Sequence, residues 1–217
     1  MYLRHWIVFL ALAAAGCTVD LWTKDWIFGK LGHYQIHGQL SESPLILIDG
    51  VFSLETHLNE GALFGIGQRQ VALFVSLSAI AVAGILIWMI WGGAIHDRLL
   101  TIALGLVMGG ILGNLYDRLG LARLTWAHGV PGHRAGEPVY AVRDWLHFQI
   151  ESIGFDWAIF NIADSLLVAG AALLLWHALW FGQPAESDDA ASQGEADASA
   201  GSSGPLEPQA ELGATGS

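Results

Sequence analysis

Two aspartates in the second half of the sequence have the surroundings expected of a catalytic pair. Asp144 lies in the stretch VRDWLHF, and Asp164 lies in FNIADSLLVAG, inside an apolar segment. Two carboxyl groups that share a partly dry site cannot both ionise at low cost, so one keeps its proton near neutral pH. The pair then offers a base that takes a proton from water and an acid that polarises a carbonyl. These residues therefore predict hydrolysis of a peptide bond without a covalent intermediate.

Further polar side chains lie in or beside apolar segments, where an ionisable group costs roughly 2.5–3.5 kcal/mol on insertion scales and usually has a function. They are Asp20, Lys24, Asn114, Asp117, Arg118 and Asn161. Asn161 precedes Asp164 by three residues, so a helix through this region would place both side chains on one face.

Structural interpretations of these residues remain open at this point. Asp164 could form an ion pair with Arg118 or Arg143, and the asparagines could join neighbouring helices. Asp20 and Lys24 are four residues apart and could be a surface pair. The stretch GLVMGGILGN before Leu115 favours a close helix-packing face over a ligand-binding loop.

The elements that must position these groups are membrane helices. The chain of 217 residues is 53% hydrophobic and 13% charged, with a mean hydropathy of +0.48, which is typical of a membrane protein. A helix needs roughly 17–25 residues to cross a bilayer. Four segments have about this length and are apolar, and tryptophans lie near most of their ends, as expected at the lipid headgroups. These predicted spans are about 6–21, 71–91, 99–116 and 158–181.

Two long loops follow the first and third spans. The first contains LILIDGVFSLETHLNEGALFGIG, whose β-branched runs and turn residues predict a small sheet on the membrane surface. The second contains residues 120–143, which are rich in Gly and Pro and predict a segment without regular structure in its middle. We predict that this segment is a mobile flap over the site, with Trp126 and Tyr140 against lipid or substrate. A tolerated surface loop is the alternative.

Other classes of protein are disfavoured. Seven of the twenty acidic residues follow residue 185, where there is no Lys or Arg, so we predict a disordered acidic tail over residues 186–217. No basic cluster suggests a nucleic-acid partner. The single cysteine and the scattered histidines suggest neither a disulfide framework nor a zinc site.

Five motifs resemble those of lipoprotein signal peptidase, or signal peptidase II, a family of aspartyl proteases of bacterial membranes. They are DLWTK (20–24), NEGALFG (59–65), GNLYDR (113–118), VRDWLHF (142–148) and FNIADS (160–165), in the order of the family. The resemblance implies an endopeptidase that uses no cofactor or metal. It cuts prolipoproteins before a cysteine that already bears diacylglycerol. The segment between Asp117 and Asp144 is longer than is usual in this family.

The resemblance also assigns residues. It implies that Asp144 and Asp164 are the catalytic pair. Roles in binding the substrate or supporting the site are implied for seven more residues, namely Asp20, Lys24, Asn59, Asn114, Asp117, Arg118 and Asn161. The implied partners are diacylglyceryl-prolipoproteins and membrane lipid, and the oligomeric state is left open.

The count of Lys and Arg residues and the resemblance predict opposite orientations of the chain in the membrane. The two long loops hold seven of the nine Lys and Arg residues, so the positive-inside rule places these loops in the cytoplasm. The resemblance implies the opposite: a protein of the bacterial cytoplasmic (inner) membrane with cytoplasmic termini and an active site near the outer face. We adopt the second orientation.

The predicted fold class is a membrane all-α protein with four transmembrane helices, a small extracytoplasmic β-sheet element and a disordered acidic C-terminal tail. We expect a four-span peptidase domain over residues 1–185 and a cytoplasmic tail over 186–217. Two alternatives remain. One is a four-span transporter or proton-coupled channel that uses Asp164 and Asp20 as relay groups, although no internal repeat supports it. The other is a lipid-anchored protein without catalytic activity that is modified at Cys17.

The stretch LAAAGC (12–17) resembles the end of a lipoprotein signal peptide, but we predict that Cys17 is neither lipidated nor cleaved. A cut before Cys17 would remove most of the first span, and small residues also serve close helix packing. Cys17→Ser should leave activity and membrane insertion unchanged. Intact mass spectrometry checks the prediction, and a chain that begins at Cys17 with added diacylglycerol mass would contradict it.

Overall fold

Four long helices form the membrane part of the protein. The computed structural model describes residues 2–37, 44–61, 67 and 69–181. Within them, four helices are long and apolar enough to cross a membrane, which confirms the predicted number of spans: α1 (Tyr2–Leu31), α3 (Val71–Ile90), α4 (Arg98–Arg118) and α5 (Ile162–Phe181). The predicted acidic tail and part of the NEGALFG motif lie outside the described residues.

The first and last helices differ from their predicted bounds. Helix α1 continues to Leu31, beyond the end predicted at residue 21, because its last turns bury Ile27 and Phe28 against loops outside the bundle. Helix α5 begins at Ile162, not at residue 158. Phe160 instead exchanges backbone hydrogen bonds with Leu146, which keeps the preceding residues extended.

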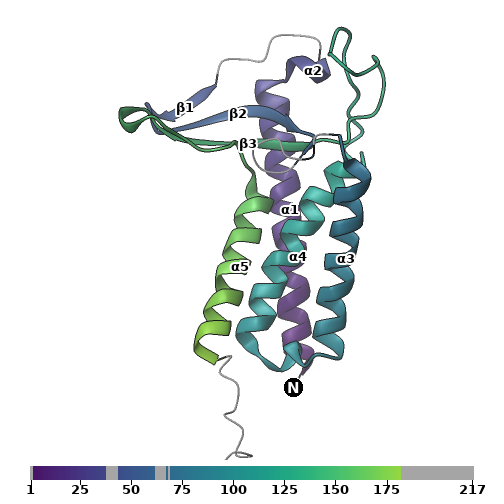
Figure 1. Cartoon of the computed structure of the whole chain (residues 1–217), viewed down its shortest axis with the longest axis vertical. Helices are drawn as coiled ribbons and strands as arrows, with labels where there is room; N and C mark the ends of the chain where they lie inside the picture. Colours follow the sequence, from purple (N-terminus) through teal and green to yellow (C-terminus); the bar gives the residue numbers. More distant parts are fainter. Residues whose placement is uncertain (1, 38–43, 62–66, 68, 182–217) are drawn as a thin grey trace, which may run out of the picture. The chain divides into compact units, whose positions relative to one another are not determined.

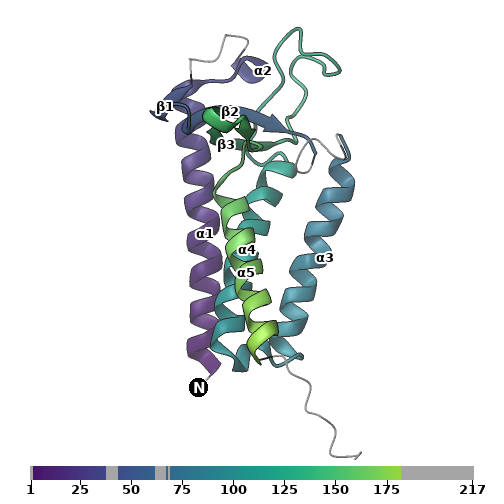
Figure 2. The ribbon, with the colours of Figure 1, turned by 60° about the vertical axis from the view of Figure 1, so that its left-hand side comes forward.

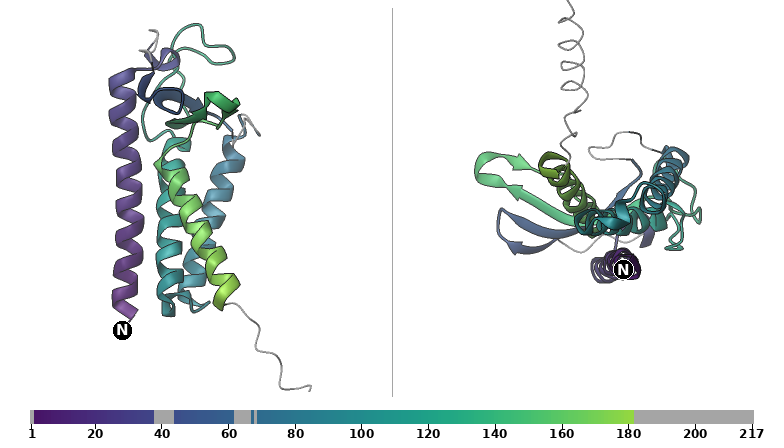
Figure 3. Two further views of the ribbon diagram at one scale, coloured as in Figure 1. Left: turned by 90° about the vertical axis from the view of Figure 1, so that its left-hand side faces the viewer. Right: turned by 90° about the horizontal axis from the view of Figure 1, so that it is seen from below.

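Helix α4 lies between the other three helices and packs against each of them (Figure 3). Its glycines allow the close approach. A Cβ atom at Gly109 would lie 3.1 Å from the carbonyl oxygen of Ala13 and 3.4 Å from Gly16 Cα, both on α1. A Cβ atom at Gly110 would lie 2.5 Å from the carbonyl oxygen of Ala163 on α5. The interpretation of both small-residue stretches as helix-packing faces is therefore confirmed.

A four-stranded antiparallel sheet lies at one end of the helices (Figures 1 and 2). Its strands follow the order β1 (Leu45–Ile48), β2 (Phe52–Asn59), β3 (Val142–Ile150) and β4 (Phe155–Asp156). The sheet predicted in the first long loop is confirmed, but half of its strands come from the second loop and were missed. Three short helical elements complete the described chain: α2 (Tyr34–His37), η2 (Ala94–His96) and η3 (Glu151–Ile153).

Two apolar clusters hold the structure on either side of a polar layer. The inner cluster joins α1, α3 and α4 around Phe9, Met89 and Leu104. The outer cluster joins the end of α1 to the sheet and to the loop between α4 and β3. Between the two clusters lie buried polar side chains: Asp20, Lys24, Asn114, Asp117, Arg143, Asp144 and Asn161.

The loop between α4 and β3 covers residues 119–141, and we call it the α4–β3 loop. As predicted, its middle has no helix or strand, and one isolated bridge joins Thr125 to Pro138. The expectation that Trp126 rests on lipid or substrate is wrong. Its side chain is 4% exposed and packs in the outer cluster together with Val130 and Val139.

We predict that Gly110→Ala destabilises the helix bundle. The added methyl group would lie 2.5 Å from the Ala163 carbonyl oxygen, a contact that backbone movement must relieve. Overpacking of this kind costs about 1–3 kcal/mol. Thermal unfolding in detergent measures the change. Gly84→Ala on α3 is the matched control, since no atom lies within 4 Å of the added methyl group. Equal melting temperatures for the two variants would contradict the prediction.

Candidate active site

Asp144 is fixed on strand β3 by two asparagine amides. Its side chain is 1% exposed. Asn161 Nδ2 donates to Asp144 Oδ1 at 2.6 Å, and Asn59 Nδ2 donates to Asp144 Oδ2 at 3.0 Å. Asn59 ends β2 and pairs with Val142 of β3, so it lies diagonally across the ladder from Asp144. The register of two strands therefore places Asn59 beside the carboxyl group.

Asp164 lies in the first turn of α5, and not well inside the span as the sequence suggested. Its backbone N–H donates to Asn161 Oδ1 at 3.0 Å, while the Asn161 N–H donates to Asp164 Oδ2 at 3.2 Å. This reciprocal pair is a capping box that starts the helix. Asn114 Nδ2 on α4 donates to the other carboxylate oxygen at 2.8 Å. The local start of α5 thus determines where the carboxylate points.

Asn161 connects the two acids. It was expected one helical turn before Asp164 on the same helix, but it precedes α5 and caps it. Its fully buried Nδ2 donates to Asp144 Oδ1 and also to Asn114 Oδ1, at 3.1 Å. One side chain therefore contacts groups on β3, α4 and α5.

Lys24, on α1, is completely buried. Its ammonium group lies 2.6 Å from Asp20 Oδ2 and 3.1 Å from Asp117 Oδ2, and it donates to Asn114 Oδ1 at 3.1 Å. Asp20 Oδ1 accepts a hydrogen bond from the Ala163 N–H at 2.9 Å. The alternative of a surface pair between Asp20 and Lys24 is therefore wrong.

The two arginines have partners other than Asp164. Arg143 pairs with Asp117, at 2.9 Å from Nε to Oδ1, and with Asp25. Arg118 Nη2 donates to the Gly61 carbonyl oxygen at 2.9 Å. No ion pair within the described ranges joins either arginine to Asp164, so that structural alternative is not supported.

The electrostatics of the site raise the pKa of Asp144. Burial, and secondly the negative charge of Asp164, raise the pKa of Asp144 to about 8. The amide donors from Asn59 and Asn161 oppose this shift but do not cancel it. A pKa of about 8 favours the protonated form of Asp144 near neutral pH.

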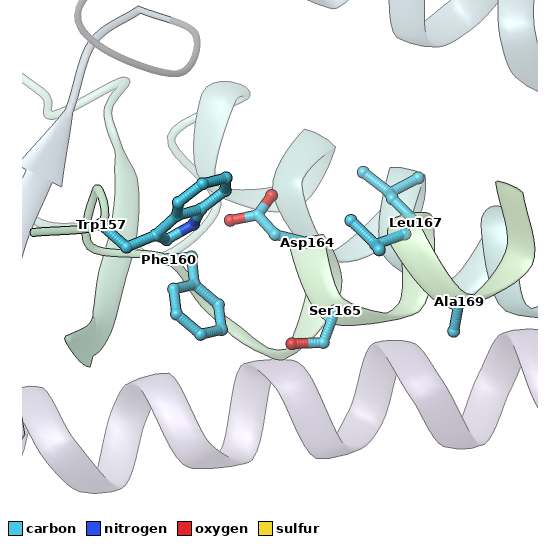
Figure 4. Close-up of a pocket in the computed structure, with 7 residues that line it drawn as sticks. Trp157, Phe160, Asp164, Ser165, Leu167 and Ala169 are labelled. Atoms are coloured by element: carbon cyan, nitrogen blue, oxygen red, sulfur yellow. The ribbon is translucent and has the colours of Figure 1, made fainter. Parts of the chain in front are cut away.

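An apolar cavity of about 510 Å³ opens beside Asp164. Figure 4 shows the carboxylate directed toward Trp157 and Phe160, with Leu167 and Ala169 further along α5. Such a cavity suits an apolar ligand that brings one polar group to the carboxylate. In the part of the chain that the structure describes, no group of His, Cys, Asp and Glu side chains is placed to hold a metal ion.

The structure brings the sequence-predicted residues into one place. Asp20, Lys24, Asn59, Asn114, Asp117, Asn161 and both candidate acids form one connected network. Arg118 joins it through Gly61, whose N–H donates to Asn59 Oδ1 at 3.0 Å. Sequence reasoning missed Asp25, which Arg143 contacts, and Glu60, which follows Asn59. The available signals were the position of Asp25 directly after the DLWTK motif and that of Glu60 inside the NEGALFG motif.

Comparisons with known proteins point to one protein family. The family model described as "Signal peptidase (SPase) II" matches residues 12–180. A lipoprotein signal peptidase of Rhodopirellula baltica is 41% identical over 79% of this chain and 71% of its own. One from Geobacillus thermodenitrificans is 33% identical over 84% and 96% of the two chains. A solved structure described as a bacterial membrane enzyme covers 82% of this chain and 92% of its own, with a TM-score of 0.61 and 22% identity, and so supports the fold.

We predict that Lys24→Gln strongly destabilises the protein. The change removes the ammonium group between Asp20 and Asp117 and leaves two buried carboxylates close together. Breaking a buried ion pair in this way costs about 3–5 kcal/mol. Thermal unfolding in detergent measures it, with Lys30→Gln on the exposed part of the same helix as control. A Lys24→Gln protein as stable as the control would show that the network does not depend on this charge.

Proposed function

The chain belongs to the signal peptidase II family, membrane proteases that remove signal peptides from prolipoproteins, and we propose that it does so with Asp144 and Asp164 as an aspartic catalytic pair. One observation carries this proposal: Asn161 holds both acids, with its side-chain amide donating to Asp144 and its backbone N–H donating to the Asp164 carboxyl group. An acid and a base in one partly buried site are what hydrolysis of a peptide bond without a covalent intermediate requires.

In the proposed mechanism, Asp164 acts as the base. A water molecule attacks the carbonyl carbon of the scissile bond and gives a proton to the Asp164 carboxylate. Asp144 gives its proton to the carbonyl oxygen, so that the tetrahedral intermediate is neutral. When the C–N bond breaks, Asp164 passes its proton to the leaving amine, and Asp144 recovers its own from the new carboxyl group. Both acids then return to their starting states.

The proposed substrate is a prolipoprotein cut before its diacylglyceryl-modified cysteine. The apolar cavity beside Asp164 supports this choice, because a signal peptide and an acylated cysteine both present apolar surface. Four polar side chains are proposed to surround the scissile bond, namely Asn59, Asn114, Arg118 and Asn161. Three more, Asp20, Lys24 and Asp117, are proposed to support the site through the buried ion pairs.

We further propose an orientation in the bacterial inner membrane, with cytoplasmic termini and the active site near the outer face. Tyr2 and Phe181 end the described helices on the side opposite the sheet, which supports one location for both ends (Figures 1 and 2). The count of positive loop residues opposes this orientation. However, Lys24 and Arg143 are buried and paired, so they do not act as loop charges. A peptidase domain over residues 1–185 and a cytoplasmic tail over 186–217 complete the proposal.

We predict that Asp144→Asn and Asp164→Asn each abolish cleavage of a labelled diacylglyceryl-prolipoprotein by the purified protein. Asparagine has nearly the same shape as aspartate but cannot exchange the proton. Asp49→Asn, at an exposed acid in the turn between β1 and β2, is the control and should cleave like wild type. Substantial cleavage by either site variant would remove that residue from the mechanism. No cleavage by the wild-type protein would instead favour a transporter or channel.

We predict that kcat/KM falls as the pH rises through about 8. The pKa of Asp144 is raised from 3.8 to about 8, so the acid form is present below this pH and is lost above it. Loss of the acid removes the proton donor for the carbonyl oxygen. The pH profile should be measured with a substrate that has no ionisable group near the cleavage site. A constant kcat/KM up to pH 10 would contradict the role given to Asp144.

A further inference from the structure

The position of Asn59 depends on the two residues that follow it. Asn59 Nδ2 donates to Asp144, and Asn59 Oδ1 accepts from the Gly61 N–H at 3.0 Å. Arg118 holds Gly61 from the side of α4, through the carbonyl oxygen. Glu60 lies between Asn59 and Gly61 in the chain, and its carboxylate contacts the α4–β3 loop. Whatever holds Glu60 therefore also helps to hold Asn59 against Asp144.

His133 of the α4–β3 loop contacts Glu60. The distance from His133 Nε2 to Glu60 Oε1 is 3.2 Å. Their side chains are only 13% and 21% exposed, so solvent screens this contact less than a surface ion pair. Arg69 approaches the other carboxylate oxygen at 3.9 Å but is 57% exposed. The better-buried partner of Glu60 is thus His133.

His133 is itself held in place by Trp126. The two rings stack with their centroids 3.9 Å apart and an angle of 14° between their planes. Trp126 lies in the outer cluster, which also contains Leu58, the residue before Asn59. Backbone hydrogen bonds from the Trp126 N–H to Glu137 and from the Ala127 N–H to Gln35 fix this part of the loop further. The imidazole therefore has a rigid support that reaches both sides of Asn59.

We propose that His133 is a positioning residue of the catalytic site. Supported by Trp126, it holds Glu60 so that Asn59 keeps its amide on Asp144. The α4–β3 loop thereby acts as a fixed brace for the active site, which differs from both the mobile flap and the passive surface loop considered from the sequence. This inference rests on the proposed function, since Asp144 is the group whose proton transfer benefits.

Enzyme kinetics test this proposal, and a second variant is expected to restore the lost contact. We expect His133→Ala to lower kcat for a labelled prolipoprotein about tenfold, which corresponds to about 1.4 kcal/mol, with little change in KM. His133→Gln, whose amide nitrogen reaches about as far as Nε2, should restore most of kcat. His128→Ala, at an exposed histidine of the same loop, is the control and should behave like wild type. Full activity of His133→Ala, or a loss that His133→Gln does not restore, would overturn the proposal.

Hydrogen exchange provides a readout that does not require activity. The Gly61 N–H donates to Asn59 Oδ1, so its exchange rate reports whether Asn59 is held. We expect faster exchange at Gly61 in His133→Ala and in Glu60→Gln, which weakens the contact from its other side, but not in His128→Ala. If the wild-type protein cleaves no prolipoprotein, the proposed function fails. The exchange measurement then still tests whether His133 and Glu60 hold Asn59 in place. Unchanged exchange in both variants would overturn it.

Discussion

The buried ammonium group of Lys24 is the constraint on which the site depends. A lysine can only donate hydrogen bonds, so the three groups around it must be acceptors: Asp20, Asp117 and the Asn114 carbonyl oxygen. Once the Asn114 oxygen faces Lys24, its Nδ2 faces the other way, toward Asp164. The charge on α1 thereby orients the amide on α4 that fixes the proposed base on α5. Well-packed apolar residues at these positions would often give an equal or higher stability than buried ion pairs. The role of Lys24 in orienting Asn114 explains why the ion pairs are present.

The two acids are placed by different kinds of structure that meet at one point. Asp144 belongs to a strand whose position is tied to α4 by Arg143 and Asp117. Asp164 belongs to the first turn of α5, whose start is set by Asn161. The connection between them pairs with the end of β3 as β4, and Phe160 then bonds to Leu146 further back along β3. This pairing brings the start of α5 directly under the strand that carries the other acid.

Hydropathy predicted the number of spans, and the motifs predicted most residues that the structure brings together in the candidate site. The start of α5 was not predicted correctly. Residues 158–160 are apolar, and apolar residues are compatible with a helix as well as with an extended segment. The pairing of Phe160 with Leu146, which keeps them extended, is not visible in the sequence. Strand β3 was missed because it carries the buried polar residues Arg143 and Asp144, whose partners lie on other elements. The contact between His133 and Glu60 was also beyond prediction, since it joins two loops that no local pattern relates.

Close helix packing and the polar network are parts of one arrangement. Ala163, whose N–H bonds to Asp20, is also the residue whose carbonyl oxygen lies against Gly110. The Asp20 carboxylate occupies the space that a Cβ atom at Gly113 would need. A larger residue at either glycine would push the first turn of α5 away from α4 and α1. Asp164 lies one residue after Ala163, so Asn114 would then no longer reach it. The glycines of α4 therefore serve the proposed chemistry directly, by setting how closely the three helices meet at the level of the two acids.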